Sequence, residues 1–177
     1  GYMNSDLVVS AARKMDVIAS QLYNQSVSYD SLFVMARNKS DMLAHIPAIF
    51  PLKETEVKYI SSYFGYRPDP IYKIEKFHSG MVFTAALGTE AYATGDGVVY
   101  DVERNEWGYG NMVILDHGYG YKTRYAHLMK PAVRKGQKVK RGQVIGYIGA
   151  TGKATGVHLH YEVLKNDDQI DPINFFY

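Results

Sequence analysis

Apolar side chains recur at steps of three and four residues over the first 45 positions, a spacing typical of amphipathic helices. One such stripe covers residues 5–25 and a second covers residues 29–45, with Ser28 placed as an N-cap and Pro47 just beyond the end. Two amphipathic helices with a short connection indicate an antiparallel hairpin. We therefore predict a helical hairpin, or the remnant of a stalk, over residues 1–46.

A hairpin cannot bury both of its apolar stripes by itself. Residues 5–45 are therefore expected to pack on the rest of the chain or on another chain. A coiled-coil partner that binds through this segment is a second interpretation of the same pattern.

The pattern changes at the prolines. Pro47, Pro51, Pro68 and Pro70 mark residues 47–70 as an extended linker, which includes one short strand near Lys58–Phe64. Residues 71–177 then form a mainly β domain, because short alternating runs are separated by Gly, Asn and Asp about every eight to twelve residues. This spacing is typical of an antiparallel β-sandwich or open barrel. The predicted strands are 81–86, 89–93, 97–104, 111–116, 120–126, 138–140, 143–149 and 157–164.

Composition narrows the function classes. The 177 residues carry a formal net charge of only +2, which does not favour nucleic acid as a partner. There is no cysteine, so a metal ion would have to be held by histidine, carboxylate or water. No run of about 18 apolar residues is present, so no segment is expected to span a membrane. Gly1 is not a natural start, which leaves room for an N-terminal targeting or anchoring segment ahead of it.

Histidine is the main candidate for chemistry. His158 and His160 lie two positions apart on a predicted strand, so both side chains point to one face, about 7 Å apart. Such a pair indicates a metal site or an acid–base pair. His78 and His127 also lie at strand edges and are further candidates. We interpret His45, at a helix end, and His117, in a Gly-flanked turn, as structural residues.

Several motifs occur in the order found in one family. They are Phe64-Gly65-Tyr66-Arg67, His78-x-Gly80, Ala93-Thr94-Gly95-Asp96-Gly97-Val98-Val99, Tyr109-Gly110-Asn111, Tyr125-Ala126-His127-Leu128, Gly149-Ala150-Thr151-Gly152 and His158-x-His160. Over about residues 58–177 the chain closely resembles the LytM/lysostaphin-like zinc metalloendopeptidases of family M23, which cut peptide cross-links in bacterial peptidoglycan. The resemblance implies the lysostaphin-like β fold and a zinc cofactor. It also implies peptidoglycan or another cell-wall protein as partner, and a place in the bacterial cell envelope, periplasmic or extracellular. A missing N-terminal segment would allow membrane anchoring there.

The resemblance also implies the roles of single residues. His78 and His160 correspond to two zinc ligands, and His127 and His158 to the catalytic histidines that serve the bound water and the transition state. The third ligand of the family is an Asp at position 82, where this chain has Val82. Valine has no lone pair to donate, so zinc binding is expected to be weakened. Thr84, Glu90 and Asp96 are the nearby oxygen donors along the chain, and none is a convincing replacement.

Three functions remain to be compared. The first is a degenerate M23 domain that does not hydrolyse and acts in cell-wall binding or in the regulation of wall hydrolysis; Val82 favours it. The second is an active zinc endopeptidase, favoured by the four retained histidines. The third is a biotinyl or lipoyl carrier, because residues 136–146 resemble its hairpins, but the Met-Lys-Met or Asp-Lys-Ala turn of such carriers is absent.

Overall fold

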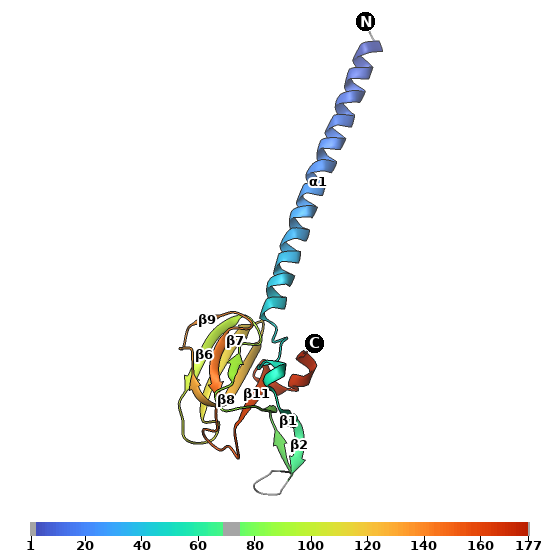
Figure 1. Ribbon diagram of the computed structural model, residues 1–177. Helices are drawn as coiled ribbons and strands as arrows, with labels where there is room; N and C mark the ends of the chain where they lie inside the picture. The colour runs from blue at the N-terminus through green and yellow to red at the C-terminus, as the bar shows by residue number, and fades with distance from the viewer. Residues whose placement is uncertain (1–2, 69–74, 177) are drawn as a thin grey trace. The chain divides into compact units, whose positions relative to one another are not determined.

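The computed structural model describes residues 3–68 and 75–176 of the chain (Figure 1). Helix α1 runs without interruption from Met3 to His45. The predicted helical hairpin is therefore wrong, although both of its halves are helical. Residues 3–45 contain neither Gly nor Pro, so nothing in the sequence forces a turn. Serine gave a misleading cap signal, because a helical serine can also bond backwards, as the Ser31 hydroxyl does to the Val27 carbonyl at 3.0 Å.

The remaining elements are almost all strands. The chain divides into two compact units between Met42 and Leu43, and the strands all belong to the second unit. They are β1 (Tyr59–Ser62), β2 (Gly65–Pro68), β3 (Glu75–His78), β4 (Met81–Thr84), β5 (Glu90–Tyr92), β6 (Gly97–Glu103), β7 (Asn111–Gly118), β8 (Tyr121–Pro131), β9 (Lys138–Val139), β10 (Val144–Ile148), β11 (His158–Lys165) and β12 (Asp168–Ile170), with short 3-10 turns at Glu54–Glu56 and Pro172–Phe175. All eight strands predicted from residue 81 onward are present.

Among the described residues, ten strands form one antiparallel sheet. Its main path runs β1-β4-β11-β8-β7-β6-β9, while β10 pairs with β5 and β8, and β12 pairs with β11 (Figure 1). Strands β2 and β3 form a separate two-stranded ribbon. The prediction of a mainly β, antiparallel fold is confirmed, and the sheet is open rather than closed into a barrel.

Of the segment predicted as a linker, residues 47–70, the described part (47–68) is largely extended and packs into the β unit. Leu52 is 2% exposed and belongs to the core, and β1 pairs with β4 at one edge of the sheet. The Tyr92 amide donates to the Pro51 carbonyl at 2.8 Å. Prolines set the extended backbone here, but apolar residues between them bury the segment. Pro70 lies outside the described residues.

The core lies on one face of β11 and its neighbours. Leu159, Tyr161 and Val163 are fully buried and belong to the hydrophobic cluster, and they alternate with His158, His160 and Glu162. Because strand side chains alternate between faces, β11 presents an apolar row to the core and a polar row to the opposite face. In the described part of the chain, no helix is both long and apolar enough to cross a membrane.

Candidate active site

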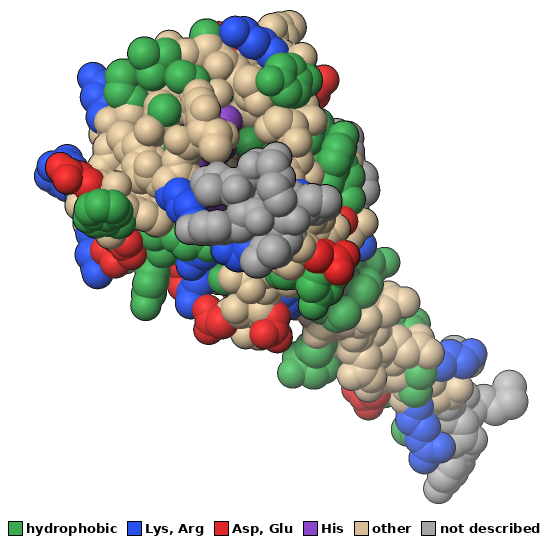
Figure 2. Space-filling model, turned by 90° about the horizontal axis from the view of Figure 1, so that it is seen from below, with side chains coloured by type: hydrophobic (Ala, Val, Ile, Leu, Met, Phe, Trp, Pro, Cys, Tyr) green, Lys and Arg blue, Asp and Glu red, His purple; other side chains and the backbone are tan. Residues whose placement is uncertain are grey.

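The four histidines predicted as site residues converge in one cleft of about 550 Å³. The ring centroids are 5.0 Å apart for His78 and His160, 4.8 Å for His127 and His158, and 6.0 Å for His127 and His160. Figure 2 shows histidine atoms recessed in this face between backbone and polar side chains. The prediction that these residues share a site rested on the family resemblance, because they come from three different strands.

Strand register sets the floor of the cleft. β4 pairs antiparallel with β11 so that Val82 lies opposite His160 and Thr84 lies opposite His158. His78 ends β3, and its Nε2 atom lies 3.2 Å from Nδ1 of His160. Val82 is 8% exposed and lines the same cleft.

A bulge in β8 directs His127 into the cleft. Leu128 pairs with Asn111 and Tyr125 pairs with Val113, so Ala126 and His127 together face a single residue of β7. His127 has φ +60°, which is uncommon outside glycine. Bulges often re-aim a side chain beside a functional site.

In three of the four histidine rings, a hydrogen bond to a backbone carbonyl oxygen shows that Nδ1 carries a proton. Nδ1 of His78 lies 2.8 Å from the Tyr63 carbonyl, Nδ1 of His127 lies 2.8 Å from that of Thr151, and Nδ1 of His158 lies 2.9 Å from that of Gly156. A carbonyl only accepts, so Nδ1 donates in each case. In the neutral ring Nε2 then keeps its lone pair.

These rings are neutral near pH 7. Burial lowers the pKa of His78 and of His127 to about 4, and burial also lowers the pKa of His158. The positive charge of the cleft therefore comes from Arg67, Lys76 and Lys153. Among the described residues that line it, none is Asp or Glu.

Glu162 was not predicted, yet it is the most heavily bonded side chain beneath the cleft. It is fully buried, and its Oε1 accepts hydrogen bonds from Ser79 Oγ at 2.5 Å, Tyr109 OH at 2.8 Å and His160 Nε2 at 2.9 Å. Arg124 pairs with Oε2 at 2.5 Å. Burial alone would raise the pKa of Glu162, but these partners outweigh it and lower the pKa to about 2.

The residues present do not complete a catalytic zinc centre. Zinc–imidazole bonds of about 2.0–2.1 Å in tetrahedral geometry place two ligand nitrogens about 3.3 Å apart, close to the 3.2 Å between His78 and His160. A catalytic zinc usually has three protein ligands, and the position where the family resemblance implies the third ligand holds the hydrocarbon side chain of Val82, opposite His160. Within the described ranges, no group of three or more His, Cys, Asp or Glu could hold a metal ion.

Oxygen donors elsewhere in the sequence are engaged in other contacts. Glu90 accepts the Tyr92 hydroxyl at 2.5 Å, and Asp96 binds Lys140 Nζ at 2.7 Å and the Arg141 amide at 2.8 Å. Neither lines the cleft.

The two histidines interpreted as structural lie outside the cleft. His45 ends α1 and packs edge-on against Tyr119. His117 is fully buried within β7, rather than in a turn as predicted. Its Nδ1 lies 2.8 Å from the Asp96 carbonyl and its Nε2 lies 2.7 Å from the Thr123 hydroxyl.

Relatives of known function resemble the β unit. The chain is 50% identical over 106 residues to the peptidoglycan DD-endopeptidase ShyA of Vibrio cholerae, a match that covers 59% of this chain and 24% of ShyA. It is 42% identical over 115 residues to the DD-carboxypeptidase/endopeptidase Mpg of Neisseria meningitidis, covering 65% of this chain and 26% of Mpg. The chain thus spans about a quarter of the length of these relatives.

Two of the solved structures that resemble this chain are also peptidases. A zinc-containing peptidase from Vibrio cholerae is 41% identical with a TM-score of 0.62, and the match covers 69% of this chain and 37% of that one. The catalytic domain of lysostaphin from Staphylococcus simulans is 31% identical with a TM-score of 0.60, over 66% of this chain and 90% of that one. The family model "Peptidase family M23" matches residues 76–172, more than half of the chain and all four site histidines. The chain belongs to peptidase family M23.

Proposed function

We propose that this M23 domain has a degenerate zinc site, does not hydrolyse peptides, and acts in cell-wall binding or in the regulation of wall hydrolysis. The observation that carries the proposal is Val82, buried directly opposite His160. Loss of a partner that only supports a ligand typically weakens metal affinity 10–100-fold. Loss of a ligand itself should weaken it further.

Apart from Val82, the cleft has features that favour the binding of an anionic ligand. It keeps an open volume of about 550 Å³ and the cationic side chains Arg67, Lys76 and Lys153. Arg67 and Lys76 lie directly opposite each other on the β2–β3 ribbon. Like charges in such a cross-strand pair repel, and an anionic ligand would relieve that repulsion. A peptide that carries carboxylates suits this cleft.

The decisive experiment is the Val82→Asp substitution. We expect the unmodified chain to contain little zinc and to leave purified peptidoglycan uncut. Val82→Asp should tighten zinc binding by at least about 100-fold, because it adds the third ligand to two nitrogens already at the right separation. Zinc content is measured by elemental analysis, affinity by competition with a chromogenic chelator, and cleavage by release of soluble muropeptides.

Val82→Asn is the matched control, since its amide has nearly the same shape as Asp but no charge. It should leave zinc affinity close to that of the unmodified chain. Stoichiometric zinc together with peptidoglycan cleavage by the unmodified chain would contradict the proposal.

The alternative is an active zinc endopeptidase. It is favoured by the convergence of His78, His127, His158 and His160, because binding alone does not require four histidines at one place. In that case His127 and His158 would be the catalytic residues. The same cleavage assay distinguishes the two functions.

Peptidoglycan, or a protein that acts on it, is the partner that the relatives suggest. ShyA and Mpg carry the names of peptidoglycan-directed or carboxypeptidase/endopeptidase enzymes, so we propose a place in the bacterial envelope, periplasmic or extracellular, with zinc as the cofactor of the family. Anchoring to the membrane through a segment ahead of Gly1 is part of the same proposal. Sedimentation of the chain with purified peptidoglycan tests the binding.

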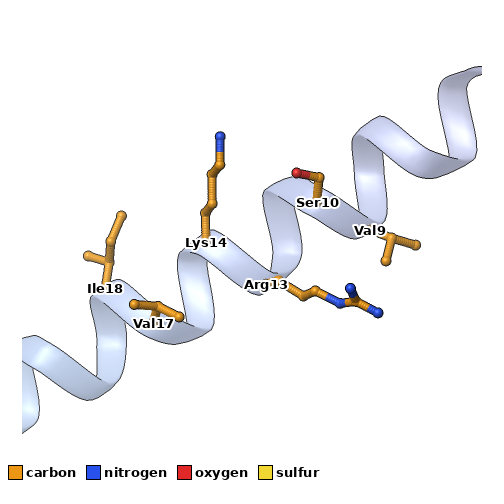
Figure 3. A pocket seen from close by; sticks show the side chains of 6 residues that line it. All are labelled: Val9, Ser10, Arg13, Lys14, Val17 and Ile18. Carbon is orange, nitrogen blue, oxygen red and sulfur yellow. The ribbon is translucent and has the colours of Figure 1, made fainter.

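Helix α1 is the candidate for a second contact. Figure 3 shows two rows of side chains along it, Ser10-Lys14-Ile18 and Val9-Arg13-Val17. Large apolar side chains of α1 are exposed, including Val8 at 66%, Met15 at 70% and Leu22 at 62%, and these three repeat every seven residues. A seven-residue apolar repeat is the pattern of a coiled coil, so we propose that residues 5–45 bind a helical partner. Analytical ultracentrifugation with and without residues 1–42 tests whether that partner is a second copy.

A further inference from the structure

Glu162 lies on the same face of β11 as His160, one alternation further along the strand. It is fully buried, and every partner that reaches its Oε1 is a donor: Ser79 at 2.5 Å, Tyr109 at 2.8 Å and His160 at 2.9 Å. The guanidinium of Arg124 occupies Oε2 at 2.5 Å. A carboxylate that accepts three hydrogen bonds on one oxygen and an ion pair on the other has no freedom to rotate.

We propose that Glu162 is the positioning residue of this site: it fixes the ring of His160 with the proton on Nε2, so that the Nδ1 lone pair faces His78. The hydrogen bond assigns the proton, because an ionised carboxylate only accepts and the nitrogen beside it must donate. In a neutral imidazole the other nitrogen then carries the lone pair.

The tautomer of His78 is also fixed by a hydrogen bond, which the ring makes on the side away from His160. Its Nδ1 donates to the Tyr63 carbonyl at 2.8 Å, so its Nε2 also carries a lone pair in the neutral ring. The 3.2 Å between Nε2 of His78 and Nδ1 of His160 therefore separates two acceptors. Two neutral acceptors cannot bond each other directly, and they are joined only by a species that both can bind, such as a shared proton, a cation or a bridging donor. The site thus keeps a preformed two-nitrogen cradle despite Val82.

The turn between β3 and β4 is built to let Ser79 reach Glu162. A Cβ at Gly80 would lie 2.3 Å from the Tyr161 carbonyl oxygen and 2.9 Å from Glu162 Cγ. Only glycine allows this close approach of the two backbones. The contact between Ser79 and Glu162 is therefore supported by the backbone as well as by the side chains.

The first test reads the tautomer directly, in the metal-free protein, from long-range ¹H–¹⁵N spectra of the histidine rings. The unmodified chain should show His160 with its proton on Nε2. Glu162→Met keeps the size of the side chain but removes both acceptor oxygens, and it should turn that single form into a mixture. Glu162→Gln keeps one acceptor oxygen and should restore the Nε2–H form at least in part.

The second test uses zinc binding in the Val82→Asp background. Adding Glu162→Met should weaken zinc affinity about 10–100-fold, and adding Glu162→Gln should weaken it less. Tyr109→Phe is the matched control, since it removes one donor from Oε1 and leaves the acceptor of His160 in place. It should leave the tautomer unchanged and change the zinc affinity by no more than about threefold, below the range of about 10–100-fold expected for Glu162→Met.

The outcomes are separable from those of the proposed function, because the tautomer is read without metal and without substrate. An Nδ1–H tautomer of His160 in the unmodified chain would overturn the proposal. So would a folded Glu162→Met protein with an unchanged tautomer. If Glu162→Met fails to fold, the zinc affinity of Glu162→Gln in the Val82→Asp background decides: an affinity weaker than that of Val82→Asp alone supports the role, and an unchanged affinity would overturn it.

Discussion

Two buried histidines of the same sheet, His117 and His160, use their nitrogens in opposite ways. His117 bonds the Asp96 carbonyl with one nitrogen and the Thr123 hydroxyl with the other, so both are engaged within the protein. His160 bonds Glu162 with Nε2 and turns Nδ1 toward His78 in the cleft. Burial is nearly the same, at 0% and 6% exposed. The number of nitrogens left for a ligand, rather than burial, separates a structural histidine from a site histidine.

The comparison extends to the other site residues. In the described structure, the rings of His127 and His158 make one hydrogen bond each, from Nδ1 to a backbone carbonyl. Substitution should therefore cost more stability at His117 than at the cleft, and this difference can be measured.

The largest effect is expected for His117→Leu. It should lower the free energy of unfolding by about 2–4 kcal/mol, because the buried carbonyl of Asp96 loses its donor and the Thr123 hydroxyl keeps only Tyr125 as a partner. Urea unfolding followed by circular dichroism measures the loss. A loss below about 1 kcal/mol would show that the buried network contributes little and would break the comparison.

A smaller effect is expected from pH. Burial lowers the pKa of His78 and His127 to about 4, below the unfolded value of 6.5. Between these values the unfolded chain binds protons that the folded chain does not, so stability falls as the pH falls from 6.5 to 4. The loss should amount to about 1–3 kcal/mol for each ring, reduced by partial exposure.

His127→Asn sharpens this test, since asparagine tolerates positive φ and its amide can donate to the Thr151 carbonyl. The slope of stability against pH is set by the number of protons that the chain takes up on unfolding. In the variant this number should be smaller by up to one. Urea midpoints at pH 7, 5.5 and 4.5 give both slopes. Identical slopes in the two proteins would show that His127 does not titrate as its burial implies.

The smallest effect is expected for His158→Leu, the counterpart of His117→Leu in the cleft. His158 is half-buried, and within the described structure its ring makes one hydrogen bond, to the Gly156 carbonyl two residues away. The expected loss of stability is below about 1 kcal/mol. A loss equal to that of His117→Leu would remove the distinction between the two classes of histidine.

Strand periodicity and turn residues were sufficient to predict most strands of the β unit, although β2, β3 and β12 were not predicted. The eight predicted strands from residue 81 onward are all present, because alternation and Gly-rich turns are local properties. The helical hairpin failed at Ser26–Ser28, where polar residues without Gly or Pro continued the helix. Burial of Leu52 and Pro51 was missed because it depends on tertiary contacts that no local pattern records.

The site could be predicted only in part. The strand pattern placed His158 and His160 on one face, and the family resemblance added His78 and His127. Glu162 belongs to the same alternation, two positions after His160, so the sequence carries a signal for it. Its partners Tyr109 and Arg124 come from other parts of the fold, so their convergence on one carboxylate needs the structure.

The pairing of Val82 with His160 has a genetic consequence. Codons for valine and aspartate that end in a pyrimidine differ only in the middle base, so a change from one residue to the other needs a single nucleotide substitution. Because the strand register already holds position 82 opposite His160, such a change places a carboxylate beside the two nitrogens without moving the backbone. A valine codon of that kind at position 82 is thus one nucleotide substitution away from an aspartate beside His78 and His160.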